Sequence, residues 1–207
     1  MAKDRCVIIA GAPGFAYFSP VAGDYIIAAD SGYRHALSAG IKPDLLIGDF
    51  DSLDFSPDEN IKTIRSPAMK DDTDTFLAVR HALALGYKNF LLLGVLGGRL
   101  DHQTANIAAC AFIAQQGGTC EMRDNANIVC AVKNGKIRLN KKKNWSVSVF
   151  SYTEKSTGVT LTGLKYPLNH ATLTNTFPVG VSNEFKDNTA TVEVKDGVLL
   201  IILSDMS

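Results

Sequence analysis

Up to about residue 130 the sequence alternates short apolar runs rich in β-branched residues with segments of helical period. Apolar strands separated by crossover helices indicate a parallel sheet covered on both faces. The pattern therefore predicts an N-terminal Rossmann-like α/β domain over residues 1–130. The expected strands are 6–10, 25–29, 44–47, 61–65, 90–95 and 119–122, and the expected helices are 32–39, 74–85 and 102–115.

The second part of the chain lacks helical period from about Ile137 onward. Residues 145–150, 189–194 and 198–203 are expected to be strands, two of them with clear alternation of apolar and polar residues. The turn Lys195-Asp196-Gly197 predicts that the last two strands form a hairpin. We therefore expect a small antiparallel β-sandwich domain over residues 137–207, and a fold class of α/β plus all-β.

Charge and composition exclude some classes of protein. Twenty-one Lys and Arg balance twenty-one Asp and Glu, so nothing indicates a nucleic acid or an anionic membrane as a partner. The longest apolar stretches fall short of the ~18 residues of a membrane span. Four cysteines lie within or beside apolar segments and lack C-x-x-C spacing, which is typical of reduced, buried thiols in a cytoplasmic protein. They are Cys6, Cys110, Cys120 and Cys130.

Aspartate is concentrated in one part of the sequence. Ten of sixteen aspartates lie between Asp30 and Asp101, most of them in four short clusters that follow apolar runs. Ligands of open parallel sheets bind at the carboxyl ends of the strands, and carboxylate oxygens suit Mg²⁺. The alternative for any one of these residues is a turn or a helix cap.

The pair Asp49 and Asp51 follows an expected strand directly. In an extended segment both side chains would point to one face while Phe50 packs on the other. The alternative is an Asx-turn in which Asp51 caps a following turn. The D-x-D spacing alone is weak evidence, although it is common in metal-dependent nucleotide-sugar glycosyltransferases.

Two further clusters precede expected helices. One of Asp72, Thr73 or Asp74 is expected to cap or begin the amphipathic helix, and the surplus acids indicate a cation or Lys70 beside them. The run Gly97-Gly98-Arg99 allows a phosphate to approach backbone amides while Arg99 clamps it. A tight turn with Asp101 as N-cap is the alternative. His35 and His102 are expected to be surface helix residues, since no His or Cys set has zinc spacing.

Taken together, these segments resemble thiamine pyrophosphokinase. The resemblance rests on Ala29–Gly32, Gly48–Ser52, Lys70–Thr75 and Gly97–His102 with Ala105-Asn106, and in the second half on Gly158–Pro167 and Val181–Phe185. It spans nearly the whole chain. Position 31 is Ser where Gly is also familiar in the family. The resemblance implies transfer of the pyrophosphoryl group of ATP to the hydroxyl of thiamine, with release of AMP.

The resemblance also implies a set of site residues. The residues with implied catalytic roles are Asp49, Asp51, Asp74, Arg99 and Asp101. Of these, Asp49, Asp51 and Asp74 would hold Mg²⁺. ATP would contact Asp30, Ser31, Ser52, Asp71, Thr73, Gly98 and Arg99. Thiamine would contact Asp101, Tyr166, Ser182 and Asn183. The family likeness further implies a cytoplasmic homodimer whose active sites join the α/β domain of one subunit to the β domain of the other.

Two other functions stay open at this stage. A metal-dependent glycosyltransferase would use Asp49-x-Asp51 but leaves the Asp71–Asp74 cluster and the Gly97–His102 turn unexplained. A non-catalytic module that binds thiamine or a nucleotide would bind ligand without turnover, and the complete set of carboxylates argues against it.

Overall fold

The computed structural model describes residues 4–51, 53–65 and 72–207. By their contacts, the residues divide into two compact units, which are considered separately. The first unit consists of Met1–Ala109 and Cys120–Asn125, and the second of Cys110–Thr119 and Ala126–Ser207. No helix in the described ranges is long and apolar enough to cross a membrane.

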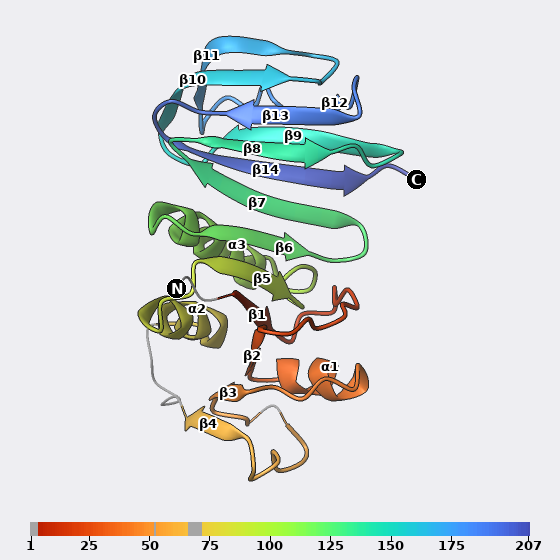
Figure 1. The fold of residues 1–207 in the computed structure, drawn as a ribbon, viewed down its shortest axis with the longest axis vertical. Helices are drawn as coiled ribbons and strands as arrows, with labels where there is room; N and C mark the ends of the chain where they lie inside the picture. Colours follow the sequence, from red (N-terminus) through yellow and green to blue (C-terminus); the bar gives the residue numbers. More distant parts are fainter. Residues whose placement is uncertain (1–3, 52, 66–71) are drawn as a thin grey trace. The chain divides into compact units, whose positions relative to one another are not determined.

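The first unit is built on a sheet in the order β6-β5-β1-β2-β3-β4, in which the pairings from β5 through β4 are parallel (Figure 1). This confirms the predicted parallel sheet. The strands are β1 (Arg5–Ile9), β2 (Tyr25–Ala29), β3 (Leu45–Gly48), β4 (Lys62–Arg65), β5 (Asn89–Leu93) and β6 (Thr119–Arg123). The helices are α1 (Gly32–Ser38), α2 (Asp74–Ala84) and α3 (Leu100–Gln115), the last being divided between the two units.

The two shorter helices cover opposite faces of this sheet (Figure 1). On the face of α1, Val7 and Ile9 pack with Leu93 and with Ala36 of the helix in one apolar cluster. Strands β1, β2, β3 and β5 are buried along nearly their whole length, as strands covered on both faces must be, whereas the edge strand β4 is mainly exposed. The continuous apolar runs of the sequence thus specify central strands.

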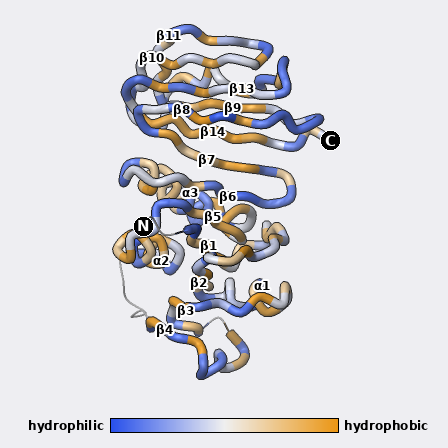
Figure 2. The backbone as a smooth tube through the Cα atoms, in the orientation of Figure 1, coloured by the Kyte–Doolittle hydropathy of each residue, from blue (hydrophilic) through white to orange (hydrophobic). Residues whose placement is uncertain are grey.

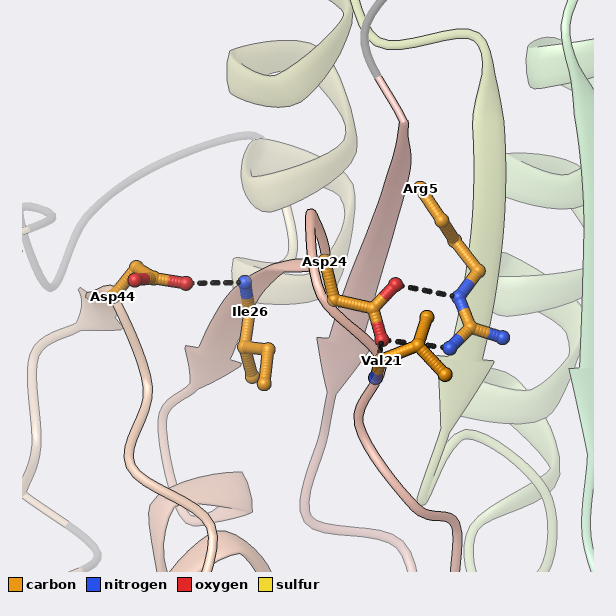
Figure 3. Close-up of polar contacts among 5 residues, drawn as sticks. All are labelled: Arg5, Val21, Asp24, Ile26 and Asp44. Carbon is orange, nitrogen blue, oxygen red and sulfur yellow. Dashed lines mark hydrogen bonds and ion pairs between the residues drawn. The ribbon is translucent and has the colours of Figure 1, made fainter.

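A salt bridge fixes the entry to the sheet (Figure 3). The guanidinium of Arg5 donates to both carboxylate oxygens of Asp24, at 2.9 and 2.7 Å, and the amide of Val21 donates to the same carboxylate at 2.9 Å. The side chain of Asp24 is only 2% exposed. Nearby, the carboxylate of Asp44 accepts the amide of Ile26 at 2.8 Å, which satisfies a donor of β2.

The second unit is a sandwich of antiparallel strands. One sheet has the order β12-β9-β14-β7 and the other has the order β11-β10-β13-β8. The strands are β7 (Asn127–Lys133), β8 (Lys136–Asn140), β9 (Trp145–Ser151), β10 (Lys155–Thr162), β11 (Leu168–Thr174), β12 (Asn183–Glu184), β13 (Thr189–Glu193) and β14 (Val198–Asp205). Figure 2 shows β7 as mainly hydrophobic, in keeping with its buried residues.

The predicted hairpin at residues 195–197 is wrong. Strand β13 pairs with β8 and β10, whereas β14 pairs with β7 and β9, so the turn passes from one sheet to the other. Val192 and Ile201 lie in the same core cluster. Alternation shows that each strand has one buried face, but it does not distinguish a neighbour in the same sheet from a strand facing it across the core.

Candidate active site

A cavity of about 530 Å³ lies where strands β1, β2 and β5 end. Its lining comes from five segments between residues 10 and 106, all of them in the first unit. Those segments are the loop after β1, the end of β2, the start of α2, the turn after β5 and the first half of α3. Because the strands are parallel, their carboxyl ends gather these segments at one edge, as in other open α/β sheets.

Glycines allow the loops around the cavity to pack closely. A Cβ atom on Gly11 would lie 1.9 Å from the hydroxyl oxygen of Ser31. A Cβ on Gly94, whose φ is +62°, would lie 2.0 Å from the carbonyl oxygen of Ala10. Side chains are therefore excluded here, and the backbone can approach a ligand. Gly11 and Gly94 were not among the predicted site residues, although both directly follow apolar runs.

Asp30 and Ser31 line the cavity directly after β2. Asp30 has a φ of +47°, in the left-handed region that Asp tolerates better than most residues, and its amide donates to the carbonyl of Ile47 at 2.8 Å. This bond draws the end of β2 to the end of β3. A Cβ on Gly48 would lie 3.0 Å from the Cα of Asp30.

The start of α2 supplies Thr73, Asp74 and Thr75 to the lining. The hydroxyl of Thr73 accepts the amide of Phe76 at 3.2 Å, so Thr73 is the N-cap that the sequence left open among three residues. Asp72 pairs instead with Arg80, at 2.5 Å, on the exposed surface. Part of the acidic surplus is therefore an ordinary ion pair.

The turn after β5 contributes Gly97, Gly98 and Arg99, with φ of +81° and +73° at the two glycines. Gln103 holds this turn, because its Oε1 accepts the amide of Gly97 at 3.1 Å and its Nε2 donates to the carbonyl of Gly98 at 3.3 Å. Asn106 lines the cavity as well, and its Nδ2 donates to the carbonyl of Val95 at 2.8 Å. The conformation of the turn is thus fixed from α3.

Arg99 faces the cavity as an exposed cation. Its Nη2 and Nε donate to the two carboxylate oxygens of Asp101, at 2.6 and 3.2 Å. Together with the amide of His102, these bonds lower the pKa of the Asp101 carboxyl. Asp101 itself does not line the cavity, whereas His102, predicted to be a surface residue, does. The other predicted surface histidine, His35, is half-buried and donates from Nε2 to the carbonyl of Ala12 at 3.0 Å.

The pair Asp49 and Asp51 departs from the expected geometry. Phe50 is buried, as predicted, but its φ is +65°, so the segment is not extended. The amide of Asp51 donates to Oδ1 of Asp49 at 3.1 Å, so an Asx-turn does form here, but Asp49 accepts the bond and not Asp51, as the alternative had it. Neither carboxylate lines the cavity, and no three acidic, His or Cys side chains in the described ranges are grouped to hold a metal. Ser52 and Asp71, predicted to contact ATP, lie outside the described residues.

The candidate thiamine contacts of the second unit are Tyr166, Ser182 and Asn183. Tyr166 is 60% exposed, whereas Asn183 is only 5% exposed. Ser182 has a φ of +56°, and its amide donates to the hydroxyl of Ser148 on β9 at 3.0 Å. The backbone of Tyr166 is hydrogen bonded to the side chain of Asn183, so these two predicted positions do meet in the fold.

Comparisons with known proteins follow the same division. Residues 21–122 match the family described as thiamin pyrophosphokinase, catalytic domain, and residues 135–199 match thiamin pyrophosphokinase, vitamin B1 binding domain. The chain is 31% identical over 185 residues to the thiamine pyrophosphokinase of Bacillus subtilis (strain 168), which covers 86% of each chain.

Solved structures of similar proteins share the fold over nearly their whole length. The crystal structure of thiamine pyrophosphokinase from Bacillus subtilis has a TM-score of 0.87 at 26% identity, covering 99% of this chain and 100% of that one. A thiamin pyrophosphokinase family protein from Enterococcus faecalis has a TM-score of 0.83 at 29% identity, with coverage of 99% and 100%.

Proposed function

Because the chain belongs to the thiamin pyrophosphokinase family, we propose that the cavity of its first unit binds the triphosphate of ATP and that its second unit binds thiamine. The activity is that of a thiamine pyrophosphokinase, which transfers the pyrophosphoryl group of ATP to the hydroxyl of thiamine and gives thiamine diphosphate and AMP. We assign ATP binding to residues 1–130 and thiamine binding and dimerisation to residues 137–207.

One observation carries this assignment. The cavity at the ends of β1, β2 and β5 joins glycine backbone, a helix N-terminus, a cation and two carboxylates in the region that matches the catalytic model. Glycine turns and helix N-termini favour phosphate oxygens, and Arg99 can bind them with two donors. Six predicted ATP or catalytic residues lie together here, namely Asp30, Ser31, Thr73, Asp74, Gly98 and Arg99.

We propose Mg²⁺ as the metal, with Asp30 and Asp74 as the carboxylates nearest the phosphates. Their oxygens suit a hard cation, and Mg²⁺ usually keeps waters and substrate phosphates rather than entering a complete protein cage. Such a mode of binding does not require a cluster of three metal-binding side chains, and the described ranges contain none. Bound Mg²⁺ would supply charge stabilisation at the phosphates. Asp49 and Asp51, at the end of the neighbouring β3, are proposed to join these residues when Mg²⁺ and ATP are bound.

The residue types fit the chemistry of phosphoryl transfer. Negative charge in the transition state is spread over phosphoryl oxygens and the departing AMP, so the protein acts mainly by positioning and electrostatic stabilisation. Arg99 neutralises this charge, while the turn that Gln103 holds keeps Arg99 in place. Tyr166 and Ser182 are the proposed thiamine contacts in the second unit, with Asn183 buried beside them. We also propose a cytoplasmic location, supported by four buried cysteines that form no disulfide bond.

Incubation with ATP, Mg²⁺ and thiamine tests the function. We expect AMP and thiamine diphosphate in equal amounts, no product without thiamine, and loss of turnover on adding EDTA. Release of ADP instead of AMP would contradict pyrophosphoryl transfer. Binding of thiamine without turnover would favour the non-catalytic module. Full activity in EDTA would contradict the metal proposal while leaving the reaction itself standing.

A further inference from the structure

We propose that Asn183 is a positioning residue that holds Tyr166, and that it does not itself contact thiamine. The proposal rests on the proposed function of the second unit, because the role of Tyr166 comes from there. It departs from the sequence-based prediction, which placed Asn183 among the thiamine contacts.

The side chain of Asn183 is hydrogen bonded to the backbone of Tyr166 and of Glu184. Its Oδ1 accepts the amide of Tyr166 at 3.0 Å and the amide of Glu184 at 2.9 Å, and its Nδ2 donates to the carbonyl of Tyr166 at 2.7 Å. An Asn amide offers two acceptor positions and two donor hydrogens, so three of its four are used. With 5% of the residue exposed, little of Asn183 is accessible to a substrate.

The clamp fixes the backbone of Tyr166, and Nζ of Lys165 lies 5.5 Å from the centroid of its ring. Tyr166 lies between β10 and β11 and is 60% exposed. Asn183 belongs to β12, which pairs with β9 of the sandwich, opposite Val147. The amide of Lys165 also donates to the carbonyl of Glu184 at 2.8 Å. Because Asn183 is held in the sheet by strand pairing, its side chain fixes the backbone amide and carbonyl of Tyr166 relative to the sheet. The position of the Tyr166 ring follows from that of its backbone.

A double-mutant cycle in the full-length protein tests the proposal. The variants are Asn183→Ala, Tyr166→Ala and the double variant, and the measured quantities are kcat and the KM values for thiamine and ATP. Loss of the clamp should raise the KM for thiamine by about fivefold to tenfold, the effect of one or two lost hydrogen bonds. The KM for ATP should stay unchanged. The double variant should match Tyr166→Ala, because residues acting through one contact are not additive.

Glu184→Gln provides the matched control. It removes the exposed ion pair of Glu184 with Lys165, at 2.9 Å, and leaves the Asn183 bonds in place. Its KM for thiamine should equal that of the unsubstituted chain. If the increases in the KM for thiamine caused by Asn183→Ala and Tyr166→Ala multiply in the double variant, the proposal is overturned, since Asn183 would then act independently of Tyr166. An unchanged KM for thiamine in Asn183→Ala would overturn it as well.

Hydrogen–deuterium exchange separates this proposal from the proposed function. The amide of Tyr166 should exchange slowly in the unsubstituted chain and at least about tenfold faster in Asn183→Ala, because its acceptor is lost. This comparison needs no catalysis, so it decides the clamp even in a chain that makes no thiamine diphosphate. Equal exchange rates would overturn the clamp. Asn183→Leu, which is of similar size and also lacks the acceptor oxygen, replaces the alanine variant if that one does not fold.

Discussion

Asp74 combines two roles at the first turn of α2. It lies directly after the Thr73 cap, where the helix dipole favours a negative charge, and it lines the cavity. An acid that only stabilised the helix would not need to face a cavity. The geometry therefore supports the proposal that Asp74 acts at the phosphates, as the family resemblance implies, in addition to its place in the first turn of the helix.

Replacing Asp74 by asparagine is expected to remove activity while the fold persists. The amide keeps the shape of the side chain but loses its charge, so turnover should fall about a hundredfold or more and depend less on Mg²⁺. Turnover would be measured across a Mg²⁺ titration, with the melting temperature as a check on folding. Asp54→Asn is the matched control, because Asp54 pairs with Arg34 on the exposed surface at 2.8 Å. Equal activity in the two variants would remove Asp74 from the site.

Arg99→Lys tests the division of the site between phosphate and thiamine. Lysine keeps the charge but cannot offer two parallel donors, so turnover should fall by about tenfold or more while the KM for thiamine changes little. Steady-state kinetics with each substrate varied in turn would separate the effects. A rise mainly in the KM for thiamine would show that Arg99, through its bond to Asp101, serves the thiamine side instead.

Side-chain positions could be predicted only where the direction of the chain fixes them. Asp30 lies in the cavity, as expected of an aspartate directly after a parallel strand. Asp51 does not, because the positive φ of Phe50 turns the backbone, and a buried phenylalanine in the left-handed region carries no sequence signal. Asn183 shows a third case, since its bonds reach Tyr166, 17 residues away in the sequence.

At the scale of elements, the periodic spacing of apolar residues predicted the helices and strands of the first unit better than the strands of the second. The helix expected at 74–85 is α2, Asp74–Ala84, and the strand expected at 25–29 is β2, Tyr25–Ala29. Local capping and buried runs specify such elements. In the second unit β10 and β11 were not anticipated, because irregular register between them blurs the alternation. The partner of a strand depends on residues far away in the sequence. The hairpin predicted for the last two strands was therefore wrong, because β13 and β14 pair with other strands.

The pair of Arg5 and Asp24 should stabilise the edge of β1 in a pH-dependent way. Burial alone would raise the pKa of Asp24, but hydrogen bonds from Arg5 and Val21 and the charge of Arg5 outweigh it, so the pKa is lowered. A carboxyl with a lowered pKa contributes stability above its unfolded pKa of about 4 and loses it as the pH falls through the folded value.

Urea unfolding measures this contribution. Asp24→Asn should lower the free energy of unfolding by about 2 kcal/mol at pH 7, since it leaves the guanidinium of Arg5 without its charged partner. The difference from the unsubstituted chain should shrink as the pH falls below about 4 and through the lower pKa of the folded state, because Asp24 then becomes protonated in both states. A difference that stays constant down to pH 2 would show that packing, not charge, accounts for the effect. Glu184→Gln, at an exposed pair, should cause little change at either pH.

At the scale of the whole molecule, the two sets of proposed contacts lie in different units. Asp30, Asp74 and Arg99 belong to the first unit, and Tyr166 and Ser182 to the second. One substrate pair must reach both sets during transfer. From the family likeness we propose a homodimer in which each active site takes its halves from different subunits, and a two-fold dimer would contain two equivalent sites of this kind.

Mixed dimers of Asp74→Asn and Tyr166→Ala chains decide between shared and single-chain sites. In a shared arrangement, one site of the mixed dimer collects both defects and the other has none. Random mixing of equal amounts makes half of the dimers mixed, so about a quarter of the unsubstituted activity should return. Each variant alone is the control, and differently tagged chains establish that mixed dimers form. The assay uses a thiamine concentration well below the KM of Tyr166→Ala, at which that variant has little activity. If each site lies within one chain, every site carries a defect and the mixture is no more active than the average of the two variants alone, which would exclude the shared arrangement.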